Sequence, residues 1–495
     1  MKEAMTEGEV YEEAEMVFGM DKPHEECGVF GIFSLDGADV IGDTYHALHA
    51  LQHRGQESCG MAFNRDGVIT GHKDLGLVTD VFTTERLAKL AVEPPAQMAV
   101  GHCRYGTTEK ARRSNAQPLV IQHLKGGMAL ANNGSITNAA EIREEMEKKG
   151  GIFQTTSDTE VVAYVVTAAR MESASIQEAL GRAMDRLQGA YSLVVMSPTK
   201  LIAARDPLGF RPLCLGRRGD CWMFASESCA FDILEAEFVR DIQPGEIVTI
   251  TKDGIQSDTS HCQEKTALCV FEFIYFARPD SVIDGSSVHT ARQRAGAFLA
   301  LEHPVHADVV IGVPDSGLDA ALGYAKQSGI PYGVGFIKNK YIGRTFIQPG
   351  QKRRENAVRI KLNVLKATVQ GKRVVLVDDS IVRGTTSALI VRLLREAGAA
   401  EVHMRLSSPP FLFPCWFGTD IDSTEHLIAH NHTVEEIAEI IGVDSLGFLS
   451  IEAVDKLADQ SVCGFCSGCF TGEYPSPPPK CAGVSKFEKG LSGKS

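Results

Sequence analysis

The spacing of hydrophobic and polar positions divides the chain into two halves with different patterns. In the first half, short β-rich segments alternate with glycine-containing turns and a few helices, which predicts a layered α+β domain. Its clearest strands are expected at residues 28–33, 191–196 and 246–250. From about residue 300, each apolar strand is followed by a helical pattern, as at 308–329 and 373–398. That alternation predicts an α/β domain with a parallel sheet and crossover helices.

Both ends of the chain lack these patterns. Residues 1–26 are acidic and short of apolar periodicity, so we expect a leader outside the fold. Residues 471–495 are rich in Pro, Ser and Gly, which predicts a flexible tail. We expect two domains between these ends, at 27–260 and 261–470, because a chain of 495 residues is too long to fold around one core.

Composition and charge exclude several classes of protein. A formal net charge of −13 argues against a nucleic-acid partner and an anionic membrane surface, because both attract basic faces. No apolar run approaches the roughly 18 residues of a membrane span, and no secretory signal is present, so we expect a cytoplasmic protein. Thirteen cysteines without regular spacing indicate buried thiols, a nucleophile or metal ligands, and not a disulfide framework.

The first candidate site is Cys27, which stands directly before an apolar strand. If the leader is removed as a propeptide, Cys27 carries a thiol and also a free α-amine, whose reference pKa of about 8 suits a general base. One residue would then supply both the nucleophile and the base. The alternative is an inert thiol in the core, since cysteines beside strands are common.

Six motifs in a fixed order extend this observation over nearly the whole first half. They lie at residues 27–33, 51–58, 101–109, 132–138, 155–160 and 205–213 and read CGVFGIF, LQHRGQES, GHCRYGTTE, NNGSITN, TTSDTE and RDPLGFRPL. On these motifs, the first half resembles the N-terminal-nucleophile glutamine amidotransferases. The resemblance implies a four-layer αββα sandwich in which Cys27 is the nucleophile that releases ammonia from glutamine.

The same resemblance implies roles for further residues. Arg104 would bind the α-carboxylate of glutamine and Asp158 its α-ammonium group, in agreement with the bidentate fit of a guanidinium to a carboxylate. The side-chain amide of Asn133 and the backbone N–H of Gly134 would form the oxyanion hole for the tetrahedral intermediate. The motif residues His53 and Arg54 are interpreted as structural support of this site.

Each assignment has a purely structural alternative. Residues 157–160 have the pattern of a capping box, in which Asp158 only favours a helix N-terminus. Asn133 and Gly134 could form an ordinary hairpin turn, and Arg104 could belong to a surface ion pair. The six motifs in one order favour the functional interpretation.

A second candidate site lies at residues 373–391, where a hydrophobic strand, two carboxylates, a loop of small residues and a helix follow one another. The loop 383–386 offers hydroxyls and a helix N-terminus, which together suit a phosphate group. Asp378 and Asp379 can hold ribose hydroxyls or Mg²⁺. A generic strand-turn-helix is the alternative, and the absence of GxxxxGK[ST] disfavours a P-loop nucleotidase.

The run VVLVDDSIVRGTTS at 374–387 resembles the phosphoribosyl pyrophosphate signature of type I phosphoribosyltransferases. The resemblance implies a phosphoribosyl pyrophosphate site made of Asp378, Asp379, Ser380, Arg383, Gly384, Thr385, Thr386 and Lys338. It places Mg²⁺ on Ser316, Asp378 and Asp379, where the ion would counter the charge of the leaving pyrophosphate. The stretch from Lys338 through Lys340 and Arg344 to Gly350 is interpreted as a lid, with a solvated loop as the alternative.

Both halves in this order resemble the family of glutamine phosphoribosylpyrophosphate amidotransferases. The resemblance implies that ammonia from glutamine is channelled to phosphoribosyl pyrophosphate. The products would be 5-phosphoribosylamine, glutamate and pyrophosphate, in the first committed step of de novo purine biosynthesis. It further implies a homodimer or homotetramer that purine nucleotides inhibit.

Three cysteines lie within seven positions near the C-terminus, at Cys463, Cys466 and Cys469. Thiolates hold zinc or an iron-sulfur cluster, and the spacing does not choose between them. A subset of the same family carries a [4Fe-4S] cluster, and this resemblance implies Cys269, Cys415, Cys466 and Cys469 as its ligands. Cys463 is an addition to that pattern, so the choice among the C-terminal thiols stays open. The cluster would be structural or oxygen-sensing, since neither reaction transfers electrons.

Three rival functions predict different sequences. Another amidotransferase of the same glutaminase class would not need the motif at 374–387. A non-catalytic sensor of phosphoribosyl pyrophosphate would not need Cys27, Arg104 and Asp158. An iron-sulfur redox protein would not need the first domain.

Overall fold

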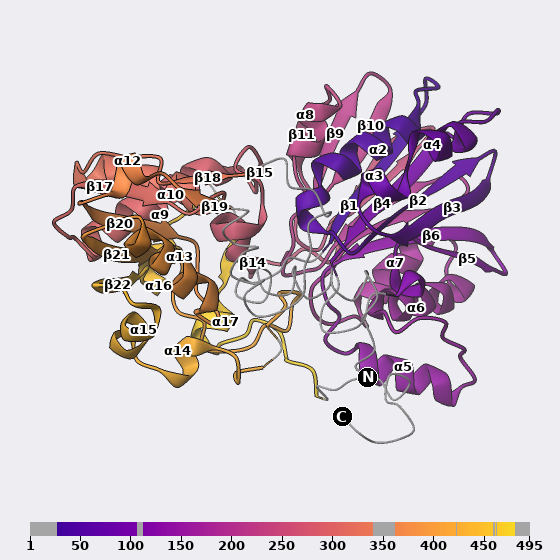
Figure 1. Cartoon of the computed structure of the whole chain (residues 1–495). Coiled ribbons are helices and arrows are strands. Elements are labelled where there is room, and N and C mark those ends of the chain that lie inside the picture. The colour runs from indigo at the N-terminus through magenta and orange to yellow at the C-terminus, as the bar shows by residue number, and fades with distance from the viewer. Residues whose placement is uncertain are drawn as a thin grey trace, which may run out of the picture.

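The computed structural model describes residues 27–105, 112–339, 362–421, 423–458, 461 and 463–480. Two lobes lie side by side (Figure 1), the first built from residues 27–258 and the second around a smaller sheet that begins at Val309. The expected leader at 1–26 lies outside the described residues. In the described part of the chain, no helix has both the length and the apolar character that a membrane span requires.

The first lobe contains two antiparallel sheets. The seven-stranded sheet has the order β11 (Glu237–Asp241), β9 (Cys214–Arg218), β10 (Cys221–Ala225), β1 (Gly28–Ser34), β4 (Met98–Arg104), β2 (Ser58–Arg65) and β3 (Val68–Leu75). The six-stranded sheet has the order β13 (Gly254–Asp258), β12 (Ile247–Thr251), β8 (Leu201–Arg205), β7 (Ser192–Met196), β6 (Gly126–Asn133) and β5 (Leu119–His123). The strands expected at 28–33, 191–196 and 246–250 are β1, β7 and β12, so these predictions are confirmed.

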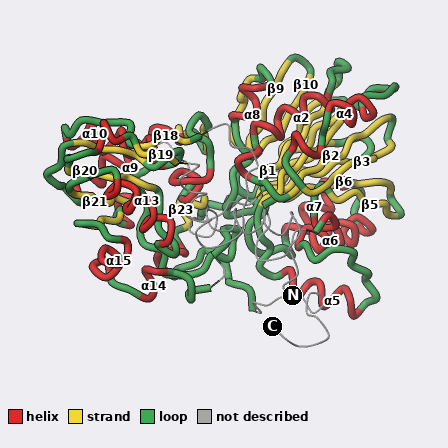
Figure 2. The backbone as a smooth tube through the Cα atoms, in the orientation of Figure 1, coloured by secondary structure: helices red, strands yellow, loops and turns green. Residues whose placement is uncertain are grey.

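Helices lie on the outer side of each sheet, which gives four layers in the order α, β, β, α (Figure 2). The first sheet is covered by α2 (Val40–Ala50) and α8 (Cys229–Ile233), and the second by α6 (Asp158–Glu172) and α7 (Ile176–Met184). Smaller elements of this lobe are η1 (Gln52–Arg54), α3 (Val78–Val81), α4 (Thr84–Leu90), η2 (Arg113–Asn115) and α5 (Ala139–Lys148). The expected αββα sandwich is confirmed.

Strand β1 illustrates why the first half contains apolar runs instead of clean alternation. Phe30 and Ile32 pack toward α2, whereas Val29 and Phe33 enter the core between the two sheets. Because β1 lies between β10 and β4 and is covered on both faces, every position of the strand is buried. The nucleophile candidate Cys27 therefore precedes one of the best-packed strands of the lobe.

The second lobe contains a four-stranded parallel sheet, in the order β17 (Val309–Gly312), β20 (Arg373–Asp378), β21 (Glu401–Leu406) and β22 (Ser445–Phe448). Val375 and Val377 of β20 pack with α9 (Val288–Glu302) and α10 (Gly317–Ser328). Val374 and Leu376 pack with α13 (Thr385–Glu396) and α15 (Val434–Ile441) on the other face. The predicted parallel sheet with crossover helices is confirmed. The remaining elements are β18 (Phe336–Lys338), β19 (Leu362–Val364), α12 (Lys366–Val369), α14 (Ile428–Asn431), α16 (Ile451–Val454) and α17 (Gly468–Thr471).

Residues 261–287, the linking segment, run between the lobes (Figure 1). The segment contains β14 (Leu268–Cys269), the π-helix η3 (Glu272–Phe276) and a hairpin of β15 (Val282–Ile283) and β16 (Ser286–Ser287). Strand β14 pairs in parallel with β23 (Phe465–Cys466), so the linking segment is held to the C-terminal part of the chain. Tyr474, within the expected tail, donates its hydroxyl to the carbonyl of Pro414 at 2.7 Å. The part of that tail that is described therefore makes specific contacts.

Candidate active sites

Cys27 precedes β1 near the middle of the seven-stranded sheet. Its side chain is 8% exposed, and its φ of 47° lies in the left-handed region, which is uncommon for residues other than glycine. The backbone carbonyl of Cys27 accepts a hydrogen bond from Nε of Arg54 at 3.2 Å. Arg54, expected only as structural support, thus contacts the residue that carries the candidate nucleophile.

Arg104 and Asp158 lie near Cys27, although they come from different layers: Arg104 ends β4 and Asp158 begins α6. Burial lowers the pKa of Arg104, but the acidic groups of Glu57, Cys27 and Asp158 leave it above the usual value. Burial raises the pKa of Asp158, and the charge of Arg104 opposes this shift. A guanidinium and a carboxylate in one pocket suit the two charged groups of an amino acid.

Glu57 is a neighbour of Arg104 that the sequence pattern did not single out. Nη1 of Arg104 donates to Oε1 of Glu57 at 2.6 Å, and the two side chains are only 15% and 12% exposed. The alternative of a surface ion pair for Arg104 is therefore wrong. Desolvation raises the pKa of Glu57 against the effect of Arg104.

Asn133 and Gly134 follow one another at the end of β6. The side chain of Asn133 is fully buried, and neither Nδ2 nor Oδ1 has a hydrogen-bond partner among the described residues. Gly134 has a φ of 131°, and a Cβ there would lie 2.4 Å from the carbonyl oxygen of Ala190. The chain continues from here toward α5 and not into a paired strand, so the hairpin alternative is wrong. A buried amide without a partner calls for an explanation, and a substrate oxyanion supplies one.

The predicted capping box at 157–160 is only half correct. Ser157 is the N-cap of α6, and its hydroxyl accepts from the backbone N–H of Thr159. Glu160 does not reach back to the backbone of Ser157. Its carboxylate accepts instead from the backbone N–H groups of Gln154 and Thr155 at 2.7 to 3.1 Å. Asp158 is thus left to accept from the N–H of Ile136 at 2.9 Å, on the side of the Asn133 loop.

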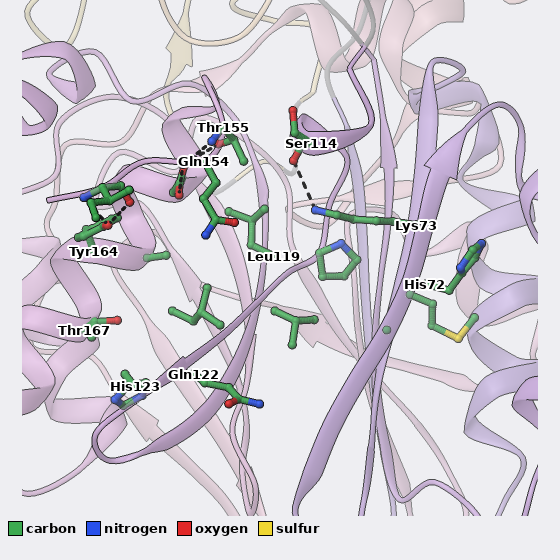
Figure 3. Close-up of a pocket in the computed structure, with 18 residues that line it drawn as sticks. His72, Lys73, Ser114, Leu119, Gln122, His123, Gln154, Thr155, Tyr164 and Thr167 are labelled. Carbon is green, nitrogen blue, oxygen red and sulfur yellow. Dashed lines mark hydrogen bonds between the residues drawn. The ribbon is translucent and has the colours of Figure 1, made fainter.

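A pocket of about 730 Å³ opens between the edge strands β3 and β5 and helix α6 (Figure 3). None of the residues expected to bind glutamine lines it. Nζ of Lys73 donates to the carbonyl of Ala116 at 2.5 Å, and burial lowers the pKa of Lys73 to about 8. The next residue, Gln117, accepts from the backbone N–H of Asn132 at 2.8 Å. This pocket wall therefore supports the strand end that presents Asn133.

In the second lobe, Asp378 and Asp379 lie at the carboxyl end of β20 and are 1% and 0% exposed. Ser380 donates to Oδ1 of Asp379 at 2.7 Å, and Ser316 donates to Oδ2 of the same carboxylate. Gly317 makes this approach possible, because a Cβ there would lie 2.5 Å from the carbonyl of Val377. Ser316, which lies 63 positions away in the sequence, is thus brought to the carboxylate of Asp379.

The loop after these carboxylates leads into the N-terminus of α13, as predicted. Gly384 is the N-cap with a φ of 85°, and Thr385 and Thr386 form the first turn of the helix. Arg383 is half-buried in the same loop. Lys338 ends β18 and pairs with Asp315 in the loop before α10. The rest of the expected lid, with Lys340, Arg344 and Gly350, lies outside the described residues.

The four cysteines expected to hold a cluster gather at the linking segment. Cys269 lies directly opposite Cys466 in the parallel pairing of β14 with β23. The backbone N–H groups of Leu412 and Phe413 donate to the carbonyl of Cys469, and the N–H of Phe417 donates to Sγ of Cys415. Burial raises the pKa of Cys469 well above the usual value, and the charges of Cys415, Cys269 and Cys466 add to this shift. Each of these thiols therefore lies within electrostatic range of the others.

Cys463 lies elsewhere, against the buried ion pair of Arg205 and Asp284. Burial raises the pKa of Cys463 to about 12, and the nearby charge of Asp284 adds to the shift. Sequence spacing alone could not separate Cys463 from Cys466 and Cys469. The separation comes from the short strand β23, which directs the chain from one neighbourhood to the other.

Comparison with known proteins identifies both halves of the chain. Residues 102–232 match the family model of a glutamine amidotransferase domain, and residues 291–406 match that of a phosphoribosyl transferase domain. The amidophosphoribosyltransferases of Bacillus subtilis and Archaeoglobus fulgidus are 47% and 48% identical to the chain. Each similarity covers 92% of this chain, together with 94% and 98% of the respective relative. The chain belongs to the amidophosphoribosyltransferase family.

Solved structures agree with this assignment. The structure described as the allosteric regulatory enzyme of purine biosynthesis has a TM-score of 0.86 at 45% identity, over 94% of this chain and 100% of that one. The glutamine phosphoribosylpyrophosphate amidotransferase of B. subtilis, complexed with ADP and GMP, has a TM-score of 0.84 at 47% identity, over 91% and 98%. As an amidophosphoribosyltransferase, the protein catalyses the first committed step of purine biosynthesis. It forms 5-phosphoribosylamine, glutamate and pyrophosphate from phosphoribosyl pyrophosphate, glutamine and water.

Proposed function

We propose that Cys27 becomes the N-terminal residue when residues 1–26 are removed, and that its thiol attacks the side-chain amide of glutamine. The freed α-amine takes the thiol proton and returns it to the departing ammonia. The resulting glutamyl thioester is then hydrolysed to glutamate. The burial of the Cys27 side chain and the hydrogen bond from Arg54 to its carbonyl support this role, because they hold the residue in place before β1.

Arg104 and Asp158 hold the α-carboxylate and the α-ammonium group of glutamine in this proposal. Glu57 keeps Arg104 charged and in place until the substrate arrives. The buried amide of Asn133 is the strongest support for this proposal, because its unpaired Nδ2 can donate a hydrogen bond to an oxyanion that exists only during the reaction. The backbone N–H of Gly134 supplies the second donor.

The phosphoribosyl pyrophosphate site is proposed at the carboxyl end of β20, on Asp378, Asp379, Ser380, Arg383, Gly384, Thr385, Thr386 and Lys338. The N-terminus of α13 offers backbone N–H groups to a phosphate. The carboxylates of Asp378 and Asp379 and the hydroxyl of Ser316 are the hard oxygen ligands that Mg²⁺ prefers, so the residues fit that ion. Bound there, Mg²⁺ would counter the charge of pyrophosphate. Lys338 approaches from β18 and would contact the same group.

We further propose that Cys269, Cys415, Cys466 and Cys469 hold a [4Fe-4S] cluster, as in the iron-sulfur subset of the family. In the described part of the chain, no three Cys, His, Asp or Glu side chains are close enough to bind one ion together. Burial raises the pKa of Cys269 to about 12, and the charge of Cys415 adds to it. Thiolates are the usual ligands of iron-sulfur clusters, and the proposal rests on the match of these four cysteines to the iron-sulfur subset. Such a cluster would pin β14 and β23 together.

The remaining proposals concern the whole molecule. We take 27–260 as the glutaminase domain, 261–470 as the phosphoribosyltransferase domain and 471–495 as the tail, with ammonia passing between the two sites inside the protein. The B. subtilis relative bound to ADP and GMP supports inhibition by purine nucleotides here as well. A homodimer or homotetramer in the cytoplasm completes the proposal.

Product analysis with the Cys27→Ala variant tests the site assignment. The intact protein, incubated with glutamine and phosphoribosyl pyrophosphate, is expected to yield equal amounts of glutamate and pyrophosphate. The variant should lose glutamine-dependent synthesis and keep ammonia-dependent synthesis. Loss of both activities in a folded variant would contradict the separation of the sites, and a mature chain that still begins at Met1 would contradict the role of Cys27. Iron and sulfide analysis of anaerobically purified protein tests the cluster, which one equivalent of zinc would refute.

A further inference from the structure

Four charged side chains, three from the first lobe and one from the linking segment, form a buried cluster beside Cys27: Arg54, Arg211, Glu227 and Glu272, here called the interlobe ion cluster. Their exposed side-chain fractions are 0% or 1%. Two guanidinium groups face two carboxylates, so the formal charges cancel. Charges buried this completely destabilise the folded chain strongly unless they stay paired. The cluster therefore requires all four members to remain in contact.

Arg54 is the member that contacts Cys27. Its Nη2 and Nη1 donate to the two carboxylate oxygens of Glu272 at 2.9 and 3.1 Å. Nη1 also donates to Glu227 at 2.5 Å, and Nε donates to the carbonyl of Cys27 at 3.2 Å. The planar guanidinium thus binds a carboxylate of the linking segment on one side and the backbone of Cys27 on another. A shift of Glu272 would rotate this plane and move the Cys27 carbonyl.

Glu272 connects this arrangement to the second lobe. It begins η3 in the linking segment, and it accepts a further hydrogen bond from Nη1 of Arg211 at 3.1 Å. Nη2 of Arg211 donates to the carbonyl of Phe417 at 3.3 Å, two residues beyond Cys415. Hydrogen bonds therefore run without a break from Phe417 to Cys27.

Glu227 stabilises the other side of the cluster. Burial raises its pKa, but His53 and Arg54 outweigh that effect and hold the pKa well below the usual range. Its carboxylate also accepts from the hydroxyl of Ser281 at 2.7 Å and from the backbone N–H of Arg278 at 2.9 Å. Glu227 thus binds the linking segment at a second point, while it remains charged.

We propose that Arg54 and Glu272 are positioning residues that make the orientation of Cys27 depend on the docking of the linking segment and the second lobe. The inference rests on the proposed role of Cys27 as nucleophile. The thiol and the α-amine both belong to the residue whose carbonyl Arg54 holds, so rotation of that carbonyl displaces both reactive groups. A displacement of about 1 Å at a reacting group can lower the rate by about 100-fold. Glutamine cleavage is thereby tied to an intact acceptor half.

The chain offers a matched control in Arg205 and Asp284. This pair also joins the first lobe to the linking segment, with two hydrogen bonds of 2.9 and 3.1 Å and exposed fractions of 0% and 2%. None of the hydrogen bonds that Arg205 makes in the described part of the chain reaches Cys27. Apart from those to Asp284, they go to backbone carbonyls of the first lobe. Asp284 has a φ of 45°, which asparagine tolerates, so Asp284→Asn removes the charge with little backbone strain.

The experiment compares Glu272→Gln with Asp284→Asn in the full-length protein. Glu272→Gln is expected to lower kcat for glutamine hydrolysis by about 10-fold or more, while the KM for glutamine changes by less than about 2-fold. Ammonia-dependent synthesis should persist, and alkylation of Cys27 by iodoacetamide should slow. Asp284→Asn should reduce the thermal midpoint to a similar extent and leave kcat within about 2-fold of the wild type. Glu272→Asp, which keeps the charge, should recover part of the lost kcat.

Other outcomes would overturn the proposal. Equal losses of kcat in both variants would mean that any broken interlobe pair has this effect. A raised KM with unchanged kcat would assign Glu272 to substrate binding. If Glu272→Gln does not fold, Arg54→Lys replaces it, since lysine keeps the charge but cannot make the paired contacts, and unchanged kcat there would refute the idea. Failure of the proposed role of Cys27 can be distinguished from failure of the positioning proposal, because in the first case Cys27→Ala would retain glutaminase activity.

Discussion

Replacement of Asn133 by alanine should separate catalysis from stability. In the resting protein the side chain is fully buried, and its amide has no partner among the described residues. Burial of an unsatisfied polar atom costs about 1–3 kcal/mol. Truncation to alanine relieves that cost, but it also removes the van der Waals packing of the amide group, which partly offsets the relief. We therefore expect the free energy of unfolding to stay the same or to rise by up to about 2 kcal/mol.

The effect on catalysis should be large and opposite in sign. Removal of one oxyanion-hole donor lowers kcat by about 100- to 1,000-fold, or about 3–4 kcal/mol of transition-state stabilisation. The KM for glutamine should change little, because in our proposal the α groups of the substrate are bound by Arg104 and Asp158. Ammonia-dependent synthesis should be unaffected, since the second lobe is untouched.

The assay combines glutaminase kinetics with denaturant unfolding, and Asn64→Ala is the matched control. Asn64 is also fully buried in the first lobe, but its side chain makes three hydrogen bonds of 2.8 to 3.2 Å. Its removal should lower the free energy of unfolding by about 2–3 kcal/mol and leave kcat within about 2-fold. The reasoning is refuted if Asn133→Ala keeps kcat within about 3-fold of the wild type, or loses as much stability as the control.

Three further predictions rest on other local features. Gly134→Ala should lower both glutaminase activity and the thermal midpoint, because its Cβ would lie 2.4 Å from the carbonyl oxygen of Ala190. Gly150→Ala is the control: with open space around Gly150, this change should lower only the thermal midpoint, and by less. Burial and the charge of Asp284 raise the pKa of Asp241 to about 7. Between pH values of about 4 and 7 the folded state therefore binds one proton more than the unfolded state, and the free energy of unfolding falls as the pH rises through that window. Asp241→Asn should therefore unfold at higher denaturant concentration than the wild type at pH 8 and at the same concentration near pH 4; a less stable variant at pH 8 would contradict this. Cys466→Ser should abolish bound iron and sulfide, whereas Cys463→Ser should retain both, and the reverse result would reassign the ligands.

The residues proposed to carry the chemistry could be singled out in the sequence because they stand in contiguous motifs that resemble those of known families. Cys27 precedes an apolar strand, Asn133 and Gly134 end another, and Asp378 and Asp379 follow a third. Local patterns of this kind depend on strand periodicity and turn chemistry, which are properties of neighbouring residues. The layered α+β character of the first half and the parallel sheet of the second were predictable for the same reason, whereas the four-layer αββα sandwich was implied by the family resemblance.

The polar partners that organise these residues could not be found in that way. Glu272 lies 218 positions from Arg54 and Glu227 lies 173 positions from it, yet the three form one buried ion cluster. Buried charges are stable only where tertiary packing brings partners together, and no local pattern records which distant partner is chosen. Only the Glu160 half of the predicted capping box is wrong, and for a local reason: the carboxylate of Glu160 accepts from backbone N–H groups of the preceding loop instead of that of its N-cap.

The order of the domains, the nucleophile candidate and the composition of the loop at 383–386 all follow from the amino-acid sequence alone. The folded chain was needed to establish that Arg54 holds the Cys27 carbonyl, that Glu57 pairs with Arg104, and that Cys463 lies apart from the other C-terminal thiols. This division arises because hydrophobic periodicity specifies which face of each element is buried, whereas the pairing of polar groups depends on how those buried faces meet.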